Sequence, residues 1–156
     1  MGPNLSPASG FITVTVIADM LTVDLSFSGL TGGVAAAGHI HCCVPVGTNI
    51  GVAVGFTGLP AATSGTYVHT FDLLDPTIYT AAFLGSGGGT AAGAEAALIA
   101  GLDAHQAYSN LHNATLPGGE IRGNLAAAPE PSLALLLAAG TLGGIGLAAR
   151  KDRRTL

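Results

Sequence analysis

The sequence predicts an all-β domain, an antiparallel β-sandwich with one short helix, followed by a C-terminal transmembrane helix. Apolar residues alternate with small or polar residues in several short runs, which is the period of a strand that buries one face. Glycine and proline separate these runs, as they do in sandwiches built from short strands. The last apolar run, residues 133–149, contains no charged residue and would reach about 25 Å as a helix.

Two segments near the start are the clearest strands. Residues 11–17 and 21–27 both alternate with period two and contain many β-branched residues. Residues 18–20 between them predict a short hairpin connection, and residues 117–119, a proline and two glycines, predict a tight turn joining the last two strands. The remaining strands are expected at residues 34–42, 52–56, 66–72, 107–112 and 120–125.

Residues 91–103 differ from the rest of the body. They are rich in alanine and contain Leu98, Ile99 and Leu102, a composition that predicts a short helix. Residues 85–89 before it are almost all glycine and are expected to form a flexible loop. The regular alternation of short strands and turns favours a Greek-key sandwich of the immunoglobulin or superoxide dismutase kind.

Charge is scarce and unevenly distributed along the chain. Of the 156 residues only 9% are charged, against 49% hydrophobic, and the formal net charge is −4. This composition excludes intrinsic disorder, which needs low hydrophobicity and high net charge. Before position 150 the sole base is Arg122, so we expect no binding to nucleic acid.

A domain boundary is expected at residue 128. It separates a body, residues 1–128, from a C-terminal segment, residues 129–156, in which the transmembrane helix spans 133–149. Prolines at the start of that segment end the upstream fold and suit the first turn of a helix. The basic residues behind the helix place the C-terminus in the cytoplasm and the body outside, by the positive-inside rule. These residues are Arg150, Lys151, Arg153 and Arg154.

The C-terminal segment is similar to a PEP-CTERM sorting signal. Pro129, Glu130 and Pro131 form the motif, and the apolar span and basic tail follow in the expected order. The resemblance implies recognition by an exosortase in the bacterial inner membrane, with cleavage near the motif. The body would then pass to the cell envelope, the surface or the extracellular matrix. A permanent membrane anchor is the alternative. No secretory signal precedes the body, so the sequence as given is expected to begin late.

Several segments of the body together resemble the CHRD domain, named after the animal protein chordin. They are residues 6–11 (SPASGF), 21–32 (LTVDLSFSGLTG), 38–43 (GHIHCC), 107–113 (AYSNLHN) and 117–125 (PGGEIRGNL). In that family another strand normally precedes the first of these segments. The sequence as given starts only five residues before that segment, so we expect this strand to be missing here. In animals such domains occur in an extracellular antagonist of growth-factor signalling, while the bacterial copies have no agreed biochemical activity.

Histidines are the candidate metal ligands. His39 and His41 are two residues apart, so a strand directs both to one face. His112, in the second histidine motif of the CHRD resemblance, is expected nearby. Three imidazoles would suit copper or zinc. The alternatives are that the histidines are hydrogen-bonded structural groups, or that the protein is an oxidoreductase of the superoxide dismutase type, a likeness of short motif and fold alone.

Cys42 and Cys43 are adjacent and are the only cysteines of the chain. An exported compartment favours their oxidation, within the molecule or between molecules. The alternatives are free thiols or a ligand facing the histidines. Glu120 and Arg122 flank an apolar residue on one face of the last predicted strand, where they could form an ion pair worth about 0–1 kcal/mol if exposed.

These observations predict a non-enzymatic structural or binding module, exported to the bacterial cell envelope or its exopolysaccharide matrix. Its expected partners are the exosortase and the inner membrane during sorting, and afterwards surface polysaccharide or envelope proteins. No cofactor is required by this interpretation. The alternative function is that of an extracytoplasmic copper- or zinc-binding protein that uses the His-x-His motif.

Overall fold

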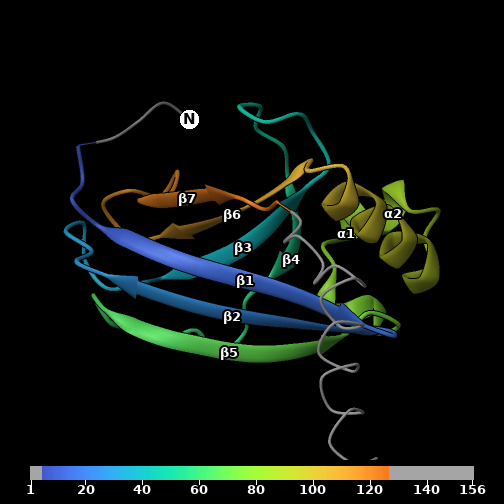
Figure 1. Cartoon of the computed structure of the whole chain (residues 1–156), viewed down its shortest axis with the longest axis horizontal. Coiled ribbons are helices and arrows are strands. Elements are labelled where there is room, and N and C mark those ends of the chain that lie inside the picture. Colours follow the sequence, from blue (N-terminus) through green and yellow to red (C-terminus); the bar gives the residue numbers. More distant parts are fainter. Residues whose placement is uncertain (1–4, 127–156) are drawn as a thin grey trace, which may run out of the picture.

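The computed structural model describes residues 5–126, which form two facing antiparallel sheets with helices at one end (Figure 1). The first sheet has the order β1 (Ser9–Ile17), β2 (Met20–Ser28) and β5 (Gly65–Asp72). The second has the order β4 (Val52–Gly55), β3 (Ala37–Cys42), β6 (Ala107–His112) and β7 (Ile121–Asn124). The predicted antiparallel β-sandwich is therefore confirmed, and its likeness to immunoglobulins or superoxide dismutases stays a prediction.

The core lies between the sheets because alternate residues of each strand point inward. In β2 the odd-numbered positions from Leu21 to Phe27 are buried and the even-numbered ones are more exposed. Opposite them, Ile40 of β3 and Val54 of β4 have no exposed surface. The two-residue connection at Ala18 and Asp19 pairs Ile17 with Met20, as the sequence predicts for the first hairpin.

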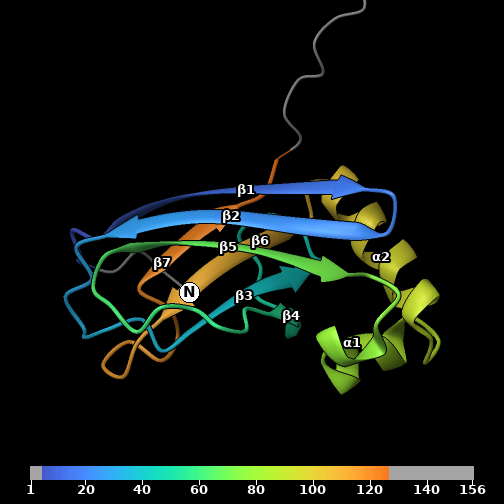
Figure 2. The same ribbon diagram turned by 90° about the horizontal axis from the view of Figure 1, so that it is seen from below.

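The helices lie together at one end of the sandwich (Figure 2). The predicted helix is confirmed as α2 (Ala91–Asp103), whose N-cap Thr90 accepts a hydrogen bond from the Gly93 amide at 3.1 Å. A 3₁₀-helix, η1 (Pro76–Ile78), and a second short helix, α1 (Ala81–Ser86), were not predicted. These two elements are additional to the predicted short helix, and the expected loop at residues 85–89 is helical at its start. Gly85 and Ser86 complete the last turn of α1, which begins at the N-cap Thr80.

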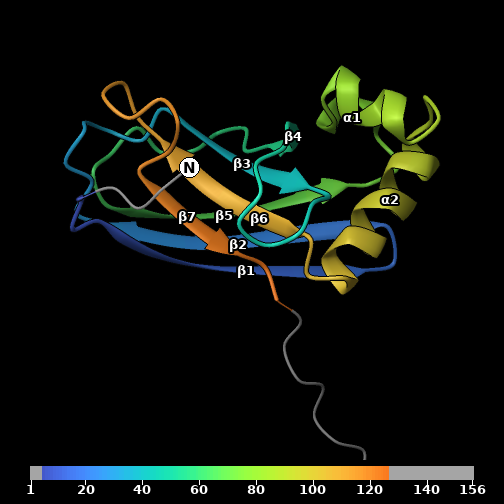
Figure 3. The same ribbon diagram turned by 90° about the horizontal axis from the view of Figure 1, so that it is seen from above.

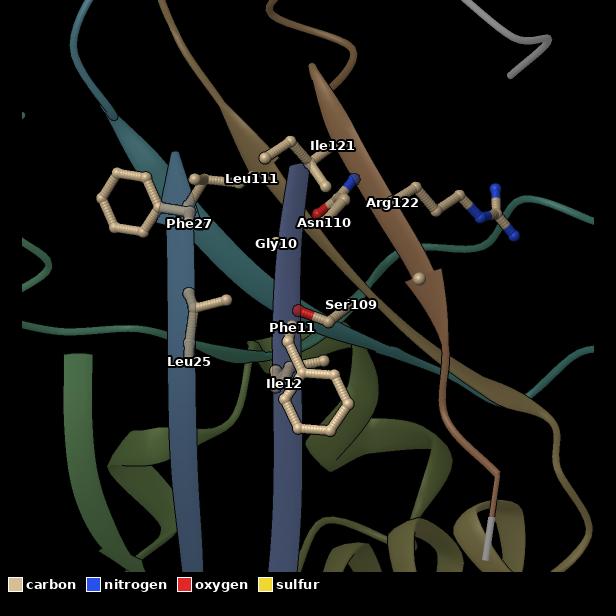
Figure 4. Close-up of a pocket in the computed structure, with 11 residues that line it drawn as sticks. Gly10, Phe11, Ile12, Leu25, Phe27, Ser109, Asn110, Leu111, Ile121 and Arg122 are labelled. Carbon is tan, nitrogen blue, oxygen red and sulfur yellow. The ribbon is translucent and has the colours of Figure 1, made fainter. Parts of the chain in front are cut away.

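The two sheets approach each other where the start of β1 meets β7. A Cβ at Gly10 would lie 2.9 Å from Ser26 O of the neighbouring strand β2, so the close pairing with β2 needs a glycine there. Ile121 Cδ1 of β7 would be at an ordinary contact distance of 3.7 Å from that Cβ. Figure 4 shows the small apolar pocket at this junction, with Leu25 and Leu111 on its walls and Arg122 extending away from it. The same strand, β7, therefore contributes Ile121 to the interior and Arg122 to the outer face.

The C-terminal predictions lie outside the described residues. This applies to the motif residues Pro129, Glu130 and Pro131, to the helix at 133–149 and to the basic residues behind it. Within residues 5–126, none of the helices is both long and apolar enough to span a membrane.

Candidate functional site

Three histidines gather on the outer face of the second sheet. Two neighbouring strands, β3 and β6, carry them, and Figure 3 shows these strands side by side. His39 and His41 of β3 point away from the core because Ile40 between them points into it. The antiparallel register of β3 and β6 places Ala37 opposite His112, which brings the third imidazole to the same face. One ligand nitrogen from each of the three side chains lies within 4.8 Å of the others. We call this group the histidine cluster.

Backbone carbonyls orient two of these rings. His41 donates its Nδ1–H to Ile50 O at 2.8 Å, and His112 donates its Nδ1–H to Pro117 O at 2.7 Å. A carbonyl oxygen only accepts hydrogen bonds, so the proton of each neutral ring is on Nδ1. The lone pairs of both Nε2 atoms therefore face the interior of the histidine cluster.

Asn110 of β6 completes the cluster. Its Oδ1 lies 2.9 Å from His41 Nε2 and 2.9 Å from His112 Nε2. His39 Nδ1 lies 3.2 Å from His112 Nε2. Burial, reinforced by the neighbouring His112 and His41, lowers the pKa of His39 to about 4, against the opposing effect of Asn110. At neutral pH His39 is therefore uncharged, the state in which imidazole coordinates metals.

The covering segment, residues 48–50 between β3 and β4, lies against part of the histidine cluster, and His41 is only 7% exposed. Tyr108 stacks on His41, with ring centroids 4.5 Å apart and planes 5° from parallel. The guanidinium of Arg122 lies over the other side of Tyr108, 3.5 Å from the ring centroid. Arg122 also donates to Thr48 O at 2.8 Å and to the Asn49 side chain. These contacts thus stabilise the position of the segment whose Ile50 carbonyl accepts the hydrogen bond from His41.

The hydroxyl of Tyr108 is expected to stabilise this covering segment. It donates to Ile50 O at 3.2 Å and accepts from the Ile50 amide at 3.3 Å. Tyr108→Phe should retain the stacking but lower the free energy of unfolding by about 1 kcal/mol. Hydrogen exchange at the Ile50 amide, followed by NMR, should become faster. Tyr79→Phe, which removes a bond to Leu73 O, is the control. Unchanged exchange at Ile50 would show that the hydroxyl does not hold the segment.

The cysteines are joined to each other by a disulfide, Cys42–Cys43, across a cis peptide bond. Cys42 is buried in the core and is 2% exposed. Both sulfurs pack against Gly101 of α2, where a Cβ would overlap them. The disulfide is intramolecular, and in this oxidised form neither sulfur is a thiolate that could join the histidine cluster.

Glu120 and Arg122 contact different groups, which corrects the expectation of an ion pair: Arg122 lies over Tyr108 and donates to residues 48 and 49. β7 begins at Ile121, and Glu120 lies before it in the turn, 6% exposed. Its carboxylate accepts bonds from Thr31 N and Thr31 Oγ1, both at 2.8 Å, from Gly32 N at 3.2 Å, and from the side chains of Ser6 and Asn113. Burial alone would raise the pKa of Glu120, but these donors outweigh it and lower the pKa to about 2.

Sequence reasoning did not identify Asn110 or Tyr108 as part of the site. Both alternate with His112 along β6, so the strand pattern placed them on one face. The missing information was which strand pairs with β6. The remaining histidines lie apart from the cluster: His69 is on β5 between the rings of Tyr67 and Phe71, and His105 follows α2.

Comparison with known proteins gives one family match. The CHRD domain matches residues 2–125, nearly the whole of the body. Neither the curated proteins nor the solved structures include a match to the chain.

Proposed function

The chain belongs to the CHRD domain family, and on that premise we propose that it is an exported module of the bacterial cell envelope or its exopolysaccharide matrix. Its role there is structural or binding rather than enzymatic. The family match favours an extracellular module, and the C-terminal resemblance to a PEP-CTERM signal favours sorting by an exosortase. The inner membrane is then the site of the precursor, and surface polysaccharide or envelope proteins are the partners after release.

The observation that carries the extracytoplasmic assignment is the Cys42–Cys43 disulfide. Disulfides persist in exported compartments and are rare in the cytosol, where thiols are kept reduced. The disulfide is also part of the packing, since Gly101 leaves room for both sulfurs against α2. A protein that folds around an oxidised pair is suited to the envelope.

Thiol trapping after export tests the compartment. Residues 1–156, placed behind a cleavable secretory signal peptide, should yield protein whose Cys42 and Cys43 do not react with a maleimide until a reductant is added. The same chain without the signal peptide should react directly in a reducing cytosol. Reactive thiols in the exported protein would contradict the assignment.

Sorting is tested separately in a bacterium that has an exosortase. Wild-type protein should leave the inner membrane with a C-terminus near Glu130, as determined by mass spectrometry. The triple variant Pro129→Ala, Glu130→Ala, Pro131→Ala should stay in the inner membrane at full length, as should wild type in a strain that lacks the exosortase. A wild-type protein that keeps its C-terminal residues in the exosortase strain would instead favour a permanent anchor.

A further inference from the structure

We propose that His39, His41 and His112 bind a divalent transition-metal ion, with Asn110 Oδ1 as a fourth contact. This site goes beyond the proposed envelope role and does not depend on it, because the ligands are within the folded domain. Zinc and copper are the two ions whose ligand preferences fit an imidazole-rich set.

The hydrogen-bond chemistry of the cluster is the first argument. Ile50 O and Pro117 O fix the protons of His41 and His112 on Nδ1, as described above. Both Nε2 lone pairs then point at Asn110 Oδ1, which is itself an acceptor with no proton to give. Asn110 Oδ1 gives neither Nε2 atom a proton, although His39 Nδ1, 3.2 Å from His112 Nε2, can donate to that atom. The lone pairs of His41 and His112 and the oxygen of Asn110 thus converge as a bound cation requires.

The orientation of the rings is the second argument. A metal-binding histidine commonly donates its other N–H to a carbonyl or carboxylate, which fixes both the tautomer and the direction of the coordinating lone pair. His41 and His112 each have such a carbonyl. The two carbonyls come from different segments, one after β3 and one after β6, so the orientation is built into two separate parts of the fold.

Spacing and access are the third argument. The three ligand nitrogens lie within 4.8 Å of one another, and tetrahedral zinc with Zn–N distances of about 2.0–2.1 Å needs them about 3.4 Å apart. Binding an ion therefore requires the ligand nitrogens to move closer together. His41 is buried, whereas His39 and His112 are partly exposed, so an ion can enter from that side.

Metal binding by the oxidised full-length chain, purified with a tag that contains no histidine, is the direct test. After treatment with EDTA, the protein is titrated with zinc chloride and with copper(II) chloride by equilibrium dialysis and elemental mass spectrometry. We expect one ion per chain, with a Kd in the micromolar range or below and tighter binding of copper than of zinc. Less than a tenth of an ion per chain at 100 µM of either metal would overturn the proposal.

Variants show whether the cluster is responsible. His112→Gln and His41→Gln should weaken binding by about 100-fold or more, while His69→Gln, outside the cluster, should leave it unchanged. Equal binding in all three variants would place the ion elsewhere and reject the site. Zinc should also shift the ¹⁵N resonance of Nε2, not of Nδ1, in His41 and His112, which a purely structural effect of the variants would not produce.

Asn110→Asp provides a test by gain of affinity, which misfolding cannot imitate. Replacing the amide by a carboxylate keeps the oxygen in place and adds a negative charge beside the ion. The affinity should rise about tenfold or more. Unchanged or weaker binding by the folded variant would exclude Asn110 Oδ1 as the fourth contact.

Discussion

Gly101→Ala is expected to lower the free energy of unfolding of the oxidised protein by about 3 kcal/mol or more. Gly101 is a buried position of α2. A Cβ there would overlap the sulfurs of Cys42 and Cys43 and come within 3.0 Å of Cys43 Cβ. The disulfide ties both sulfurs to each other, so neither can rotate away without moving the backbone of β3 or α2. The measurement is denaturant unfolding followed by circular dichroism.

Gly85→Ala is the matched control, since Gly85 is also a helical glycine. A Cβ at this position would meet nothing within 4 Å. The substitution should therefore stabilise the protein by about 0.5–1 kcal/mol, because alanine has the higher helix propensity. If Gly101→Ala unfolds within 0.5 kcal/mol of wild type, the close packing of the disulfide on α2 is wrong.

Local sequence patterns predicted the strands well, for a physical reason. Each predicted strand overlaps an observed one, because a strand with one buried face shows its period of two within a few residues. α2 was predicted at its observed bounds, because its alanine-rich composition contrasts with the rest of the body. α1 was missed because its C-terminal part, around Gly85, is continuous with a run of glycines that is typical of a loop.

The site was less accessible to sequence reasoning because it depends on pairing between distant strands. The face shared by His39 and His41 follows from their spacing alone. The contact with Asn110 follows from the register of β3 with β6, which no local pattern specifies. Glu120 was misplaced for a related reason: a carboxylate beside a turn is usually exposed. Here a loop more than 80 residues earlier in the chain surrounds it with donors.

Glu120→Gln is expected to be the second strongly destabilising substitution, by about 2 kcal/mol or more at pH 7. The carboxylate oxygens of Glu120 accept bonds from Thr31, Gly32, Asn113 and Ser6, and so join the N-terminal segment, the loop after β2 and the turn before β7. The amide of glutamine can accept through one oxygen only, and its NH₂ would face other donors. Thermal and denaturant unfolding measure the loss.

The effect should depend on pH in a defined direction. The pKa of Glu120 is lowered in the folded state to about 2, from an ordinary value of 4.5. The carboxylate therefore stabilises the fold above pH 4.5, and this contribution is lost as the pH falls from 4.5 towards 2. Wild type should lose stability over that window more steeply than Glu120→Gln, so the difference between the two proteins should shrink at low pH.

Glu95→Gln separates this effect from a general loss of negative charge. Burial raises the pKa of Glu95, and the nearby charges of Asp19 and Asp72 raise it further. Its ionised form is therefore disfavoured by folding, and the substitution should slightly stabilise the protein at pH 7, opposite in sign to Glu120→Gln. The same chemical change then distinguishes a carboxylate held by donors from one that faces other carboxylates. If both variants changed stability in the same direction and to the same extent, net charge rather than the bonds of Glu120 would explain the result.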